Sequence, residues 1–192
     1  MSAPCQIIAA TAALVLAGCA WKHQAPAWQT AVDHQVAQLG YRNWIVVAEP
    51  SFPAQNLPGV RQVSAPVGIA EAVDYVLTSM ERTENLRPRV YVTRELRLVE
   101  NDFAPGIDEF RPRLTASLHG HETTELDQQA LLVLLEDINS RFDVLVIRTQ
   151  TALPYTSVFF ELQPGYWDAS SESWLRDRMS LEPLQKLVRP ER

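Results

Sequence analysis

Glu49 is the first residue whose position suggests chemistry, because it directly follows an apolar run. Residues 45–48 read Ile-Val-Val-Ala, and Pro50 and Pro53 follow shortly after. A continuous apolar run that ends at prolines is typical of a strand buried on both faces of a sheet. Sheets of α/β proteins bind ligands beyond the carboxyl ends of their strands. The carboxylate therefore predicts a ligand site, and the simpler interpretation is a solvated loop acid.

A second candidate group is the pair His119 and His121 in the segment Leu-His-Gly-His-Glu, residues 118–122. Alternate residues of an extended chain point to the same face, so both imidazoles could approach one ligand with help from Glu122. Two imidazoles without a third ligand fall short of a zinc site. We therefore predict no metal centre, and a polar loop before a helix is the simpler interpretation.

Other kinds of catalytic machinery are missing from the sequence. The seven glycines form no G-x-G-x-x-G or G-K-[ST] array, and no G-x-S-x-G motif occurs. The only cysteines, Cys5 and Cys19, lie close to the N-terminus. We therefore expect no cofactor, which argues against a cofactor-dependent oxidoreductase or an NTPase.

The elements that must position these residues alternate between strands and helices along the chain. Buried apolar runs predict strands over residues 44–48, 60–63, 90–92, 143–147 and 157–162. Helical spacing predicts helices over 28–39, 69–80 and 124–142, with Thr124 and Asp127 as a capping box, and a further helix after Gly165. Residues 93–118 carry no clear pattern. This alternation predicts a single α/β domain with a mostly parallel sheet flanked by helices, plus a C-terminal helical extension.

Composition limits the classes of partner. The 192 residues are 46% hydrophobic, which is enough for a packed core. Lys and Arg total 17 against 23 Asp and Glu, a formal charge of -6. A chain this acidic lacks the basic surface of a nucleic-acid-binding protein, so we expect no nucleic-acid partner.

The N-terminus has the pattern of a secreted protein. Residues 7–17 are apolar but too few to span a bilayer, and their length is typical of a signal peptide. They lead into Leu-Ala-Gly-Cys-Ala, residues 16–20, which resembles the bacterial lipobox. That resemblance implies a signal peptide over 1–18, acylation of Cys19 with palmitate-type chains, and a lipid-anchored tether over 19–27. The absence of Lys and Arg from residues 1–6 is unusual for a signal peptide, and a coincidental run of small residues is the alternative.

Acyl chains on Cys19 would hold the protein at a membrane. Ala20 after the cysteine, by the same resemblance, favours outer-membrane sorting. We therefore expect a location in the cell envelope, on the outer membrane and facing the periplasm.

Two segments resemble the D-ribose pyranase and fucose mutarotase family. They are VAQLGYRNWIVVAEPSFPA, residues 36–54, and LVIRTQTALPYTSVFFELQPGYW, residues 145–167. In that family a helix ends in Leu/Met-Gly-His, a buried strand ends in Asp-Ala-x-Phe/Leu-Pro, and Tyr-x-Asn precedes the last strand. The resemblance extends over residues 28–166 and implies a ribose pyranase-like fold, with residues 167–192 as an extension.

The resemblance also implies site residues. Tyr41 takes the position of the catalytic histidine and Glu49 that of its acidic partner, while Tyr155 and Ser157 would bind the sugar. His121, or its neighbour His119, would replace a further family histidine. The family forms ring-shaped homo-oligomers with sites between neighbouring subunits, so a homo-oligomer is expected.

The family interconverts anomers or ring forms of a free sugar without a cofactor. One group takes the anomeric hydroxyl proton while another protonates the ring oxygen, and such groups work best when their pKa lies near the operating pH. Free tyrosine and glutamate titrate near 10 and about 4.3, so this pair needs a shifted pKa, for which Arg42 and Arg148 are the candidate cations.

We therefore expect a lipoprotein with a monosaccharide-binding, mutarotase-like domain whose catalysis is reduced or lost. Its partners would be a small sugar and, through the lipid anchor, the membrane. Two alternatives stay open. One is an active, cofactor-independent sugar isomerase of the mutarotase or pyranase type, and the other is an anchored structural or interaction lipoprotein.

Overall fold

The structure is a computed structural model that describes residues 28–54, 56 and 58–181. The predicted signal peptide, the tether and the lipidation site Cys19 lie outside the described residues. Within the part that is described, no helix is long and apolar enough to cross a membrane.

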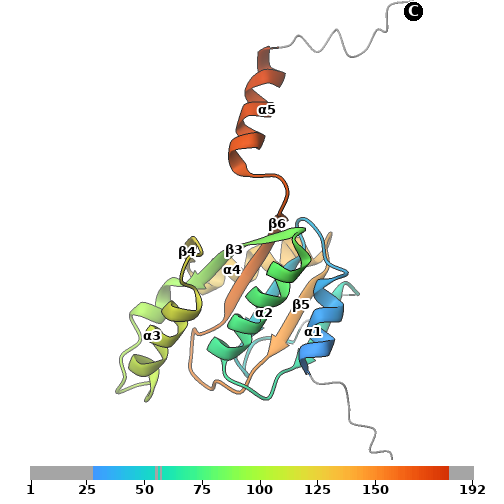
Figure 1. The fold of residues 1–192 in the computed structure, drawn as a ribbon. Coiled ribbons are helices and arrows are strands. Elements are labelled where there is room, and N and C mark those ends of the chain that lie inside the picture. The colour runs from blue at the N-terminus through green and yellow to red at the C-terminus, as the bar shows by residue number, and fades with distance from the viewer. Residues whose placement is uncertain (1–27, 55, 57, 182–192) are drawn as a thin grey trace, which may run out of the picture.

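A six-stranded sheet with the order β2-β5-β1-β6-β3-β4 forms the centre of the domain (Figure 1). Its strands are β1 (Trp44–Ala48), β2 (Val60–Ser64), β3 (Leu86–Thr93), β4 (Thr123–Leu126), β5 (Val144–Arg148) and β6 (Val158–Pro164). The pairs β2–β5, β5–β1 and β3–β4 are parallel, whereas β6 runs antiparallel to both β1 and β3. The predicted α/β class with a mostly parallel sheet is confirmed.

Helices cover both faces of this sheet. The helices of the described chain are α1 (Trp28–Val36), α2 (Ile69–Thr83), the short 3-10 helix η1 (Arg94–Arg97), α3 (Ile107–Ser117), α4 (Gln128–Asn139) and α5 (Ala169–Leu181), and of these α5 does not pack on the sheet. Apolar side chains of α1, α2 and α3 pack on one face, and those of α4 pack on the other. Figure 1 shows α1 and α2 in front of the sheet and α4 behind it.

The central strand β1 explains the unbroken apolar run in the sequence. All five of its residues are buried. Ile45 and Val47 belong to the core beneath α1 and α2, while Trp44, Val46 and Ala48 belong to the core beneath α4. Because both faces are covered, the strand is apolar throughout. Glu49 follows it directly and therefore lies at the carboxyl end of β1.

The predicted start of α4 was wrong. Thr124 does not cap the helix, because residues 123–126 form strand β4 on the edge of the sheet beside β3. The helix begins at Gln128, and the Asp127 side chain makes no capping bond. The Glu95 carboxylate accepts the Gln128 N–H instead, at 3.0 and 3.1 Å. β-Branched threonines suit an edge strand, and that preference outweighed the capping pattern.

The C-terminal helix α5 points away from the domain (Figure 1). The predicted helix is confirmed, but it is not packed into the core, since none of residues 169–180 is buried. Trp174 keeps 60% and Met179 keeps 49% of its surface exposed.

Asp33 links α1 to α2, two helices that share a core with Ile45 and Val47 of β1. Its carboxylate accepts hydrogen bonds from Ser79 Oγ at 2.6 Å, Tyr75 Oη at 2.8 Å and Arg82 Nη1 at 3.3 Å. Burial by itself raises the pKa of Asp33, but the Ser79 and Tyr75 hydrogen bonds and the Arg82 charge lower it below its ordinary value of 3.8.

Asp33→Asn should therefore lower the free energy of unfolding by about 1 kcal/mol at neutral pH, a value reduced by the solvent exposure of the carboxylate. A carboxyl whose pKa is lowered in the folded state stabilises above its unfolded pKa, and this contribution disappears as the pH falls through the folded value. Urea unfolding at neutral and at strongly acid pH measures the difference. Asp74→Asn, at an exposed position of α2, is the control. An equal loss for both variants, or a loss that persists in acid, would contradict the assigned role of Asp33.

Candidate functional site

Glu49 lies at the carboxyl end of β1 and is buried, with 7% of its surface exposed. The interpretation as a solvated loop acid is therefore wrong. Within the described residues no Lys, Arg or His forms an ion pair with it. An acidic side chain without a neighbouring cation needs several hydrogen-bond donors to remain buried.

Those donors come mainly from the two residues that precede β6. Glu49 Oε2 accepts hydrogen bonds from the Thr156 N–H at 3.1 Å and the Ser157 hydroxyl at 3.2 Å. The Thr156 hydroxyl lies 3.3 Å from the same oxygen, but its single proton points to the closer Leu153 carbonyl at 2.8 Å. Ser157 Oγ also accepts the Glu49 N–H at 3.3 Å. The other carboxylate oxygen, Oε1, accepts one longer bond, from Ser51 Oγ at 3.4 Å. A carboxylate oxygen has two lone pairs, so Oε1 retains acceptor capacity.

Tyr155 lies in the turn that presents these donors. Its φ of 61° is in the left-handed region, which a non-glycine residue adopts at a cost of roughly 1 kcal/mol or more. Two side-chain bonds hold the turn: Thr93 Oγ1 donates to the Tyr155 carbonyl at 2.5 Å, and Thr156 Oγ1 donates to the Leu153 carbonyl at 2.8 Å. The Tyr155 side chain remains 36% exposed. The strained turn therefore directs the Thr156 N–H at Glu49 and leaves the phenol at the surface.

The loop after Glu49 is fixed from the neighbouring strand β5. Arg148 Nη1 donates to the Pro50 and Phe52 carbonyls at 3.2 and 2.8 Å, and its Nε donates to Gln62 Oε1 at 3.0 Å. Phe52 is buried and packs edge-on against Phe159. Arg148 thus holds the loop in place through the backbone carbonyls of Pro50 and Phe52.

Tyr41 lies at the opposite end of β1 from Glu49. A strand advances roughly 3.3 Å per residue, so the five residues of β1 alone separate the two positions by about 13 Å or more. One chain therefore does not bring Tyr41 to Glu49. The Tyr41 side chain is 56% exposed, and the Arg42 guanidinium lies 5.8 Å from the centre of its ring.

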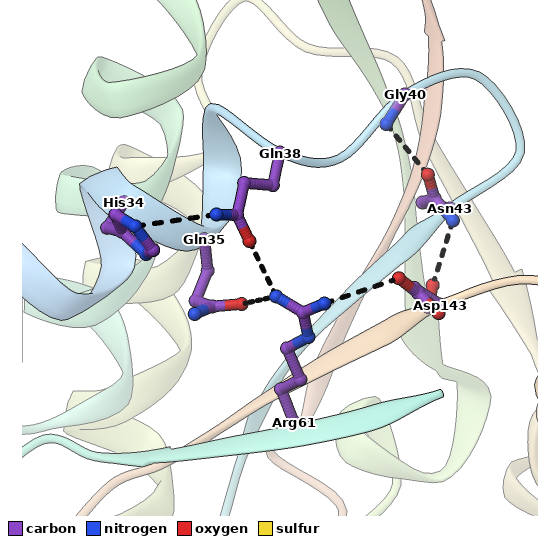
Figure 2. Close-up of polar contacts among 7 residues, drawn as sticks. All are labelled: His34, Gln35, Gln38, Gly40, Asn43, Arg61 and Asp143. Atoms are coloured by element: carbon purple, nitrogen blue, oxygen red, sulfur yellow. Dashed lines mark hydrogen bonds and ion pairs between the residues drawn. The ribbon is translucent and has the colours of Figure 1, made fainter. Parts of the chain in front are cut away.

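A polar network around Asn43 and Arg61 fixes the loop that carries Tyr41 (Figure 2). Asn43 Oδ1 accepts the Gly40 N–H at 2.7 Å, and Asn43 Nδ2 donates to the Asp143 carbonyl at 3.3 Å. Arg61 on β2 donates to Gln35 and Gln38 at 2.8 and 2.6 Å. The end of α1 is thereby joined to the sheet, and Tyr41 is held at the amino end of β1.

His121 lies neither beside Glu49 nor beside Tyr41. It lines a cavity of about 460 Å³ between α3 and the strands β3 and β4, together with His119. Among the described residues, no group of three His, Cys, Asp or Glu side chains could hold a metal ion.

The structure thus brings Ser157 into contact with Glu49, places Tyr155 in the adjoining turn, and places Tyr41 and His121 elsewhere. Sequence reasoning missed Thr156, whose N–H donates to Glu49, and Thr93, which holds the turn. Only the register that places Val47 opposite Val158 shows that Thr156 faces Glu49.

No protein-family model matches the sequence, and no curated protein matches it. Among solved structures, RbsD of Bacillus subtilis complexed with D-ribose is similar, with a TM-score of 0.50 and 17% identity over 69% of this chain and 90% of that chain. The fucose mutarotase of Streptococcus pneumoniae in complex with L-fucose matches with a TM-score of 0.47 and 17% identity, over 73% and 96%. FucU of Bifidobacterium longum matches with a TM-score of 0.45 and 15% identity, over 67% and 88%. The likeness to RbsD confirms the predicted ribose pyranase-like fold, and at this identity it shows the fold alone.

Proposed function

We propose that this domain binds a small free sugar at the carboxyl end of β1, with Glu49 as the central acceptor. The observation that carries the proposal is a buried carboxylate whose partners among the described residues are backbone N–H and hydroxyl donors, with one oxygen still able to accept. A sugar offers several hydroxyl donors, and a hydrogen bond to a charged acceptor is stronger than one between neutral groups. The resemblance of residues 36–54 and 145–167 to sugar-converting proteins supports the same choice of ligand.

In this proposal each side chain of the site has a distinct task. Glu49 Oε1 accepts a sugar hydroxyl proton, and the exposed phenol of Tyr155 donates to or accepts from the ring substituents. Ser157 and Thr156 keep the carboxylate in position through Oε2. The Arg148 bonds to the loop at Pro50 and Phe52 limit its movement, so little order has to be imposed when the sugar binds.

Turnover is reduced or lost in the proposed function. Ring opening needs one group to take the anomeric proton and another to protonate the ring oxygen. Of the described histidines, His34 lies on α1, and His119 and His121 line the separate cavity. The site of one chain therefore offers Glu49 and a phenol, but no imidazole from these residues.

An active mutarotase is the second candidate, and the position of Tyr41 is the observation behind it. Because Tyr41 is exposed at the amino end of β1, it could approach Glu49 only from a second copy of the chain. A homo-oligomer in which the amino end of one sheet meets the carboxyl end of the next would complete that pair.

We also propose that Cys19 carries the lipid anchor and that the protein resides on the outer membrane, facing the periplasm. The support is the segment Leu-Ala-Gly-Cys-Ala together with the apolar run before it. In this proposal residues 19–27 form the tether that precedes the first described helix, which begins at Trp28. Mass spectrometry of the mature protein should detect acyl chains on Cys19, and an unmodified, uncleaved N-terminus would refute this assignment.

Calorimetric titration with ribose, fucose and galactose tests the sugar-binding function. We expect saturable heat with at least one of these sugars, because Glu49 Oε1 can accept a hydrogen bond from a sugar hydroxyl. Saturation-transfer NMR on the same sugars measures how fast the anomers exchange. Exchange no faster than in buffer supports a binding protein, whereas clear acceleration favours the active mutarotase. If no monosaccharide produces heat or a spectral change, the domain does not bind free sugars and the proposal fails.

A further inference from the structure

The cavity beside α3 is the feature of the molecule that the proposed function leaves unused. It has a volume of about 460 Å³, within the range typical of small-molecule sites. Its walls come from β3, η1, α3, β4 and the turn at residues 118–121. We propose that this cavity binds an amphipathic organic anion, a molecule with an apolar body and one oxyanion head group.

The buried side chains that line the cavity indicate that the ligand has an apolar body. Leu96, Leu114 and Leu118, each at most 8% exposed, line it together with Val92. The contact of a hydrocarbon body with these side chains would remove apolar surface from water on both sides. A free monosaccharide would place hydroxyl groups against leucines that cannot accept their hydrogen bonds, so the cavity suits a different ligand from the Glu49 site.

The charged side chains that line the cavity indicate that the ligand carries an anionic head group. The chain as a whole is acidic, with a formal charge of -6, yet the cavity is lined by two arginines, Arg97 and Arg111, against one carboxylate, Glu125. Two imidazoles, His119 and His121, add further hydrogen-bonding groups. Arg111 is paired with Asp108 and Arg97 with Glu125, so the anion would be bound by guanidinium donors that an exposed ion pair can release.

Arg111 is already oriented for this role. Its Nε donates to the Leu96 carbonyl at 3.0 Å, and its two terminal nitrogens donate to the Val99 carbonyl and to Asp108. These three bonds fix the guanidinium against the cavity wall. Because an arginine has five N–H donors, the fixed group retains donors for a ligand.

Arg97 is the cation that can change partners. Its Nε lies 3.3 Å from Glu125 Oε2, and the two side chains keep 61% and 45% of their surface exposed. An ion pair this exposed contributes little to stability, so a ligand head group can displace Glu125 at small cost. A carboxylate or phosphate would then be held between Arg97 and the wall that carries Arg111.

The turn between α3 and β4 places the two imidazoles. Gly120 has a φ of 86°, a left-handed conformation that suits glycine, and the His121 N–H closes the turn on the Leu118 carbonyl at 3.1 Å. The turn thereby places the Leu-His-Gly-His segment among the residues that line the cavity.

Calorimetric titration of the full chain with octanoate tests the proposal, because octanoate combines a hydrocarbon body with a carboxylate. We expect saturable binding of octanoate, and much weaker binding of 1-octanol, which lacks the charge, and of acetate, which lacks the body. Arg97→Gln should weaken octanoate binding at least about fivefold, since it removes a charge-assisted bond. Arg94→Gln is the matched control: Arg94 lies on the same 3-10 helix and pairs with Asp127 at 3.3 Å, but it does not line the cavity.

A second pair of variants guards against a folding defect. Thr115 is exposed on α3 and lines the cavity, so Thr115→Trp should fill it and abolish octanoate binding. Thr78→Trp is its control, because Thr78 is exposed on α2 and, like Thr115, bonds the carbonyl of the fourth preceding residue. NMR should show octanoate shifting the imidazole signals of His119 and His121.

Three results would overturn the proposal: no binding of octanoate, equal binding of octanol, or equal effects of the Arg97 and Arg94 exchanges. Each of them is independent of whether sugars bind at Glu49, because the ligands and the variants differ.

Discussion

Exchange of Glu49 for glutamine should weaken the binding of a free sugar at least about tenfold while leaving the domain folded. The Thr156 N–H and the Ser157 hydroxyl both donate to Oε2, so the glutamine oxygen has to take that place. The amide nitrogen then replaces Oε1, the oxygen proposed to accept from the sugar. An NH₂ group cannot accept a hydroxyl proton, and the negative charge is lost as well.

The measurement is a calorimetric titration of the wild type and the variant with the sugar that binds best. Glu71→Gln, at an exposed position of α2, serves as the control for loss of one negative charge. Circular dichroism and thermal unfolding confirm that both variants are folded. Unchanged affinity in the Glu49 variant would mean that the carboxylate only joins β1 to β6.

Replacement of Gly165 by alanine should destabilise the protein by about 3 kcal/mol, a large effect for one methyl group. A Cβ atom at this position would lie 2.3 Å from the Glu84 carbonyl oxygen and 2.9 Å from the Asn85 carbonyl carbon. Both are backbone atoms of the turn between α2 and β3, so no side-chain rotation relieves the contact. The Gly165 N–H also donates to the Asn85 carbonyl at 2.7 Å, which keeps the two segments together.

Urea unfolding of the Gly165→Ala variant measures this loss. Gly40→Ala is the matched control, because a Cβ there would meet nothing closer than Asn43 Oδ1 at 3.8 Å. That control should be neutral or slightly stabilising, since alanine restricts the unfolded chain. Similar stability for both variants would show that the backbone at Gly165 lies farther from Glu84 and Asn85 than described.

The strands were the most predictable part of the fold. The apolar run at residues 45–48 indicated a strand buried on both faces, and every residue of β1 is indeed buried. The direction of β6 was less evident, although the chain contained a clue. Residues 149–157, between β5 and β6, carry no helical pattern, and parallel strands need a longer crossover, usually a helix.

Segments governed by tertiary contacts were not predictable. Residues 93–118 form η1 and α3, but Pro112 lies inside α3 and interrupts its helical pattern. The start of α4 depends on Glu95, a residue far away in the sequence, which provides the capping that Thr124 was expected to provide.

The candidate site was predictable only where residues adjoin strand ends. Glu49, Tyr155 and Ser157 follow or precede buried strands, so their convergence could be foreseen from the family resemblance. The separation of Tyr41 from Glu49 follows from the length of β1, since a residue before a strand and a residue after it lie at opposite edges of the sheet. The bonding of Thr156 to Glu49 depends on the register of β1 and β6 and on the left-handed turn at Tyr155. Neither feature could be predicted from the residue types in the sequence.

The most direct test of a sugar site at Glu49 is a saturation-transfer difference NMR experiment on the folded chain with ribose, fucose and galactose. Binding at the carboxyl end of β1 predicts magnetisation transfer to a sugar, a chemical-shift change at the Tyr155 ring, and the loss of both in Glu49→Gln. Transfer that persists unchanged in the variant, with the Tyr155 ring signal unmoved, would place the sugar elsewhere and contradict the account.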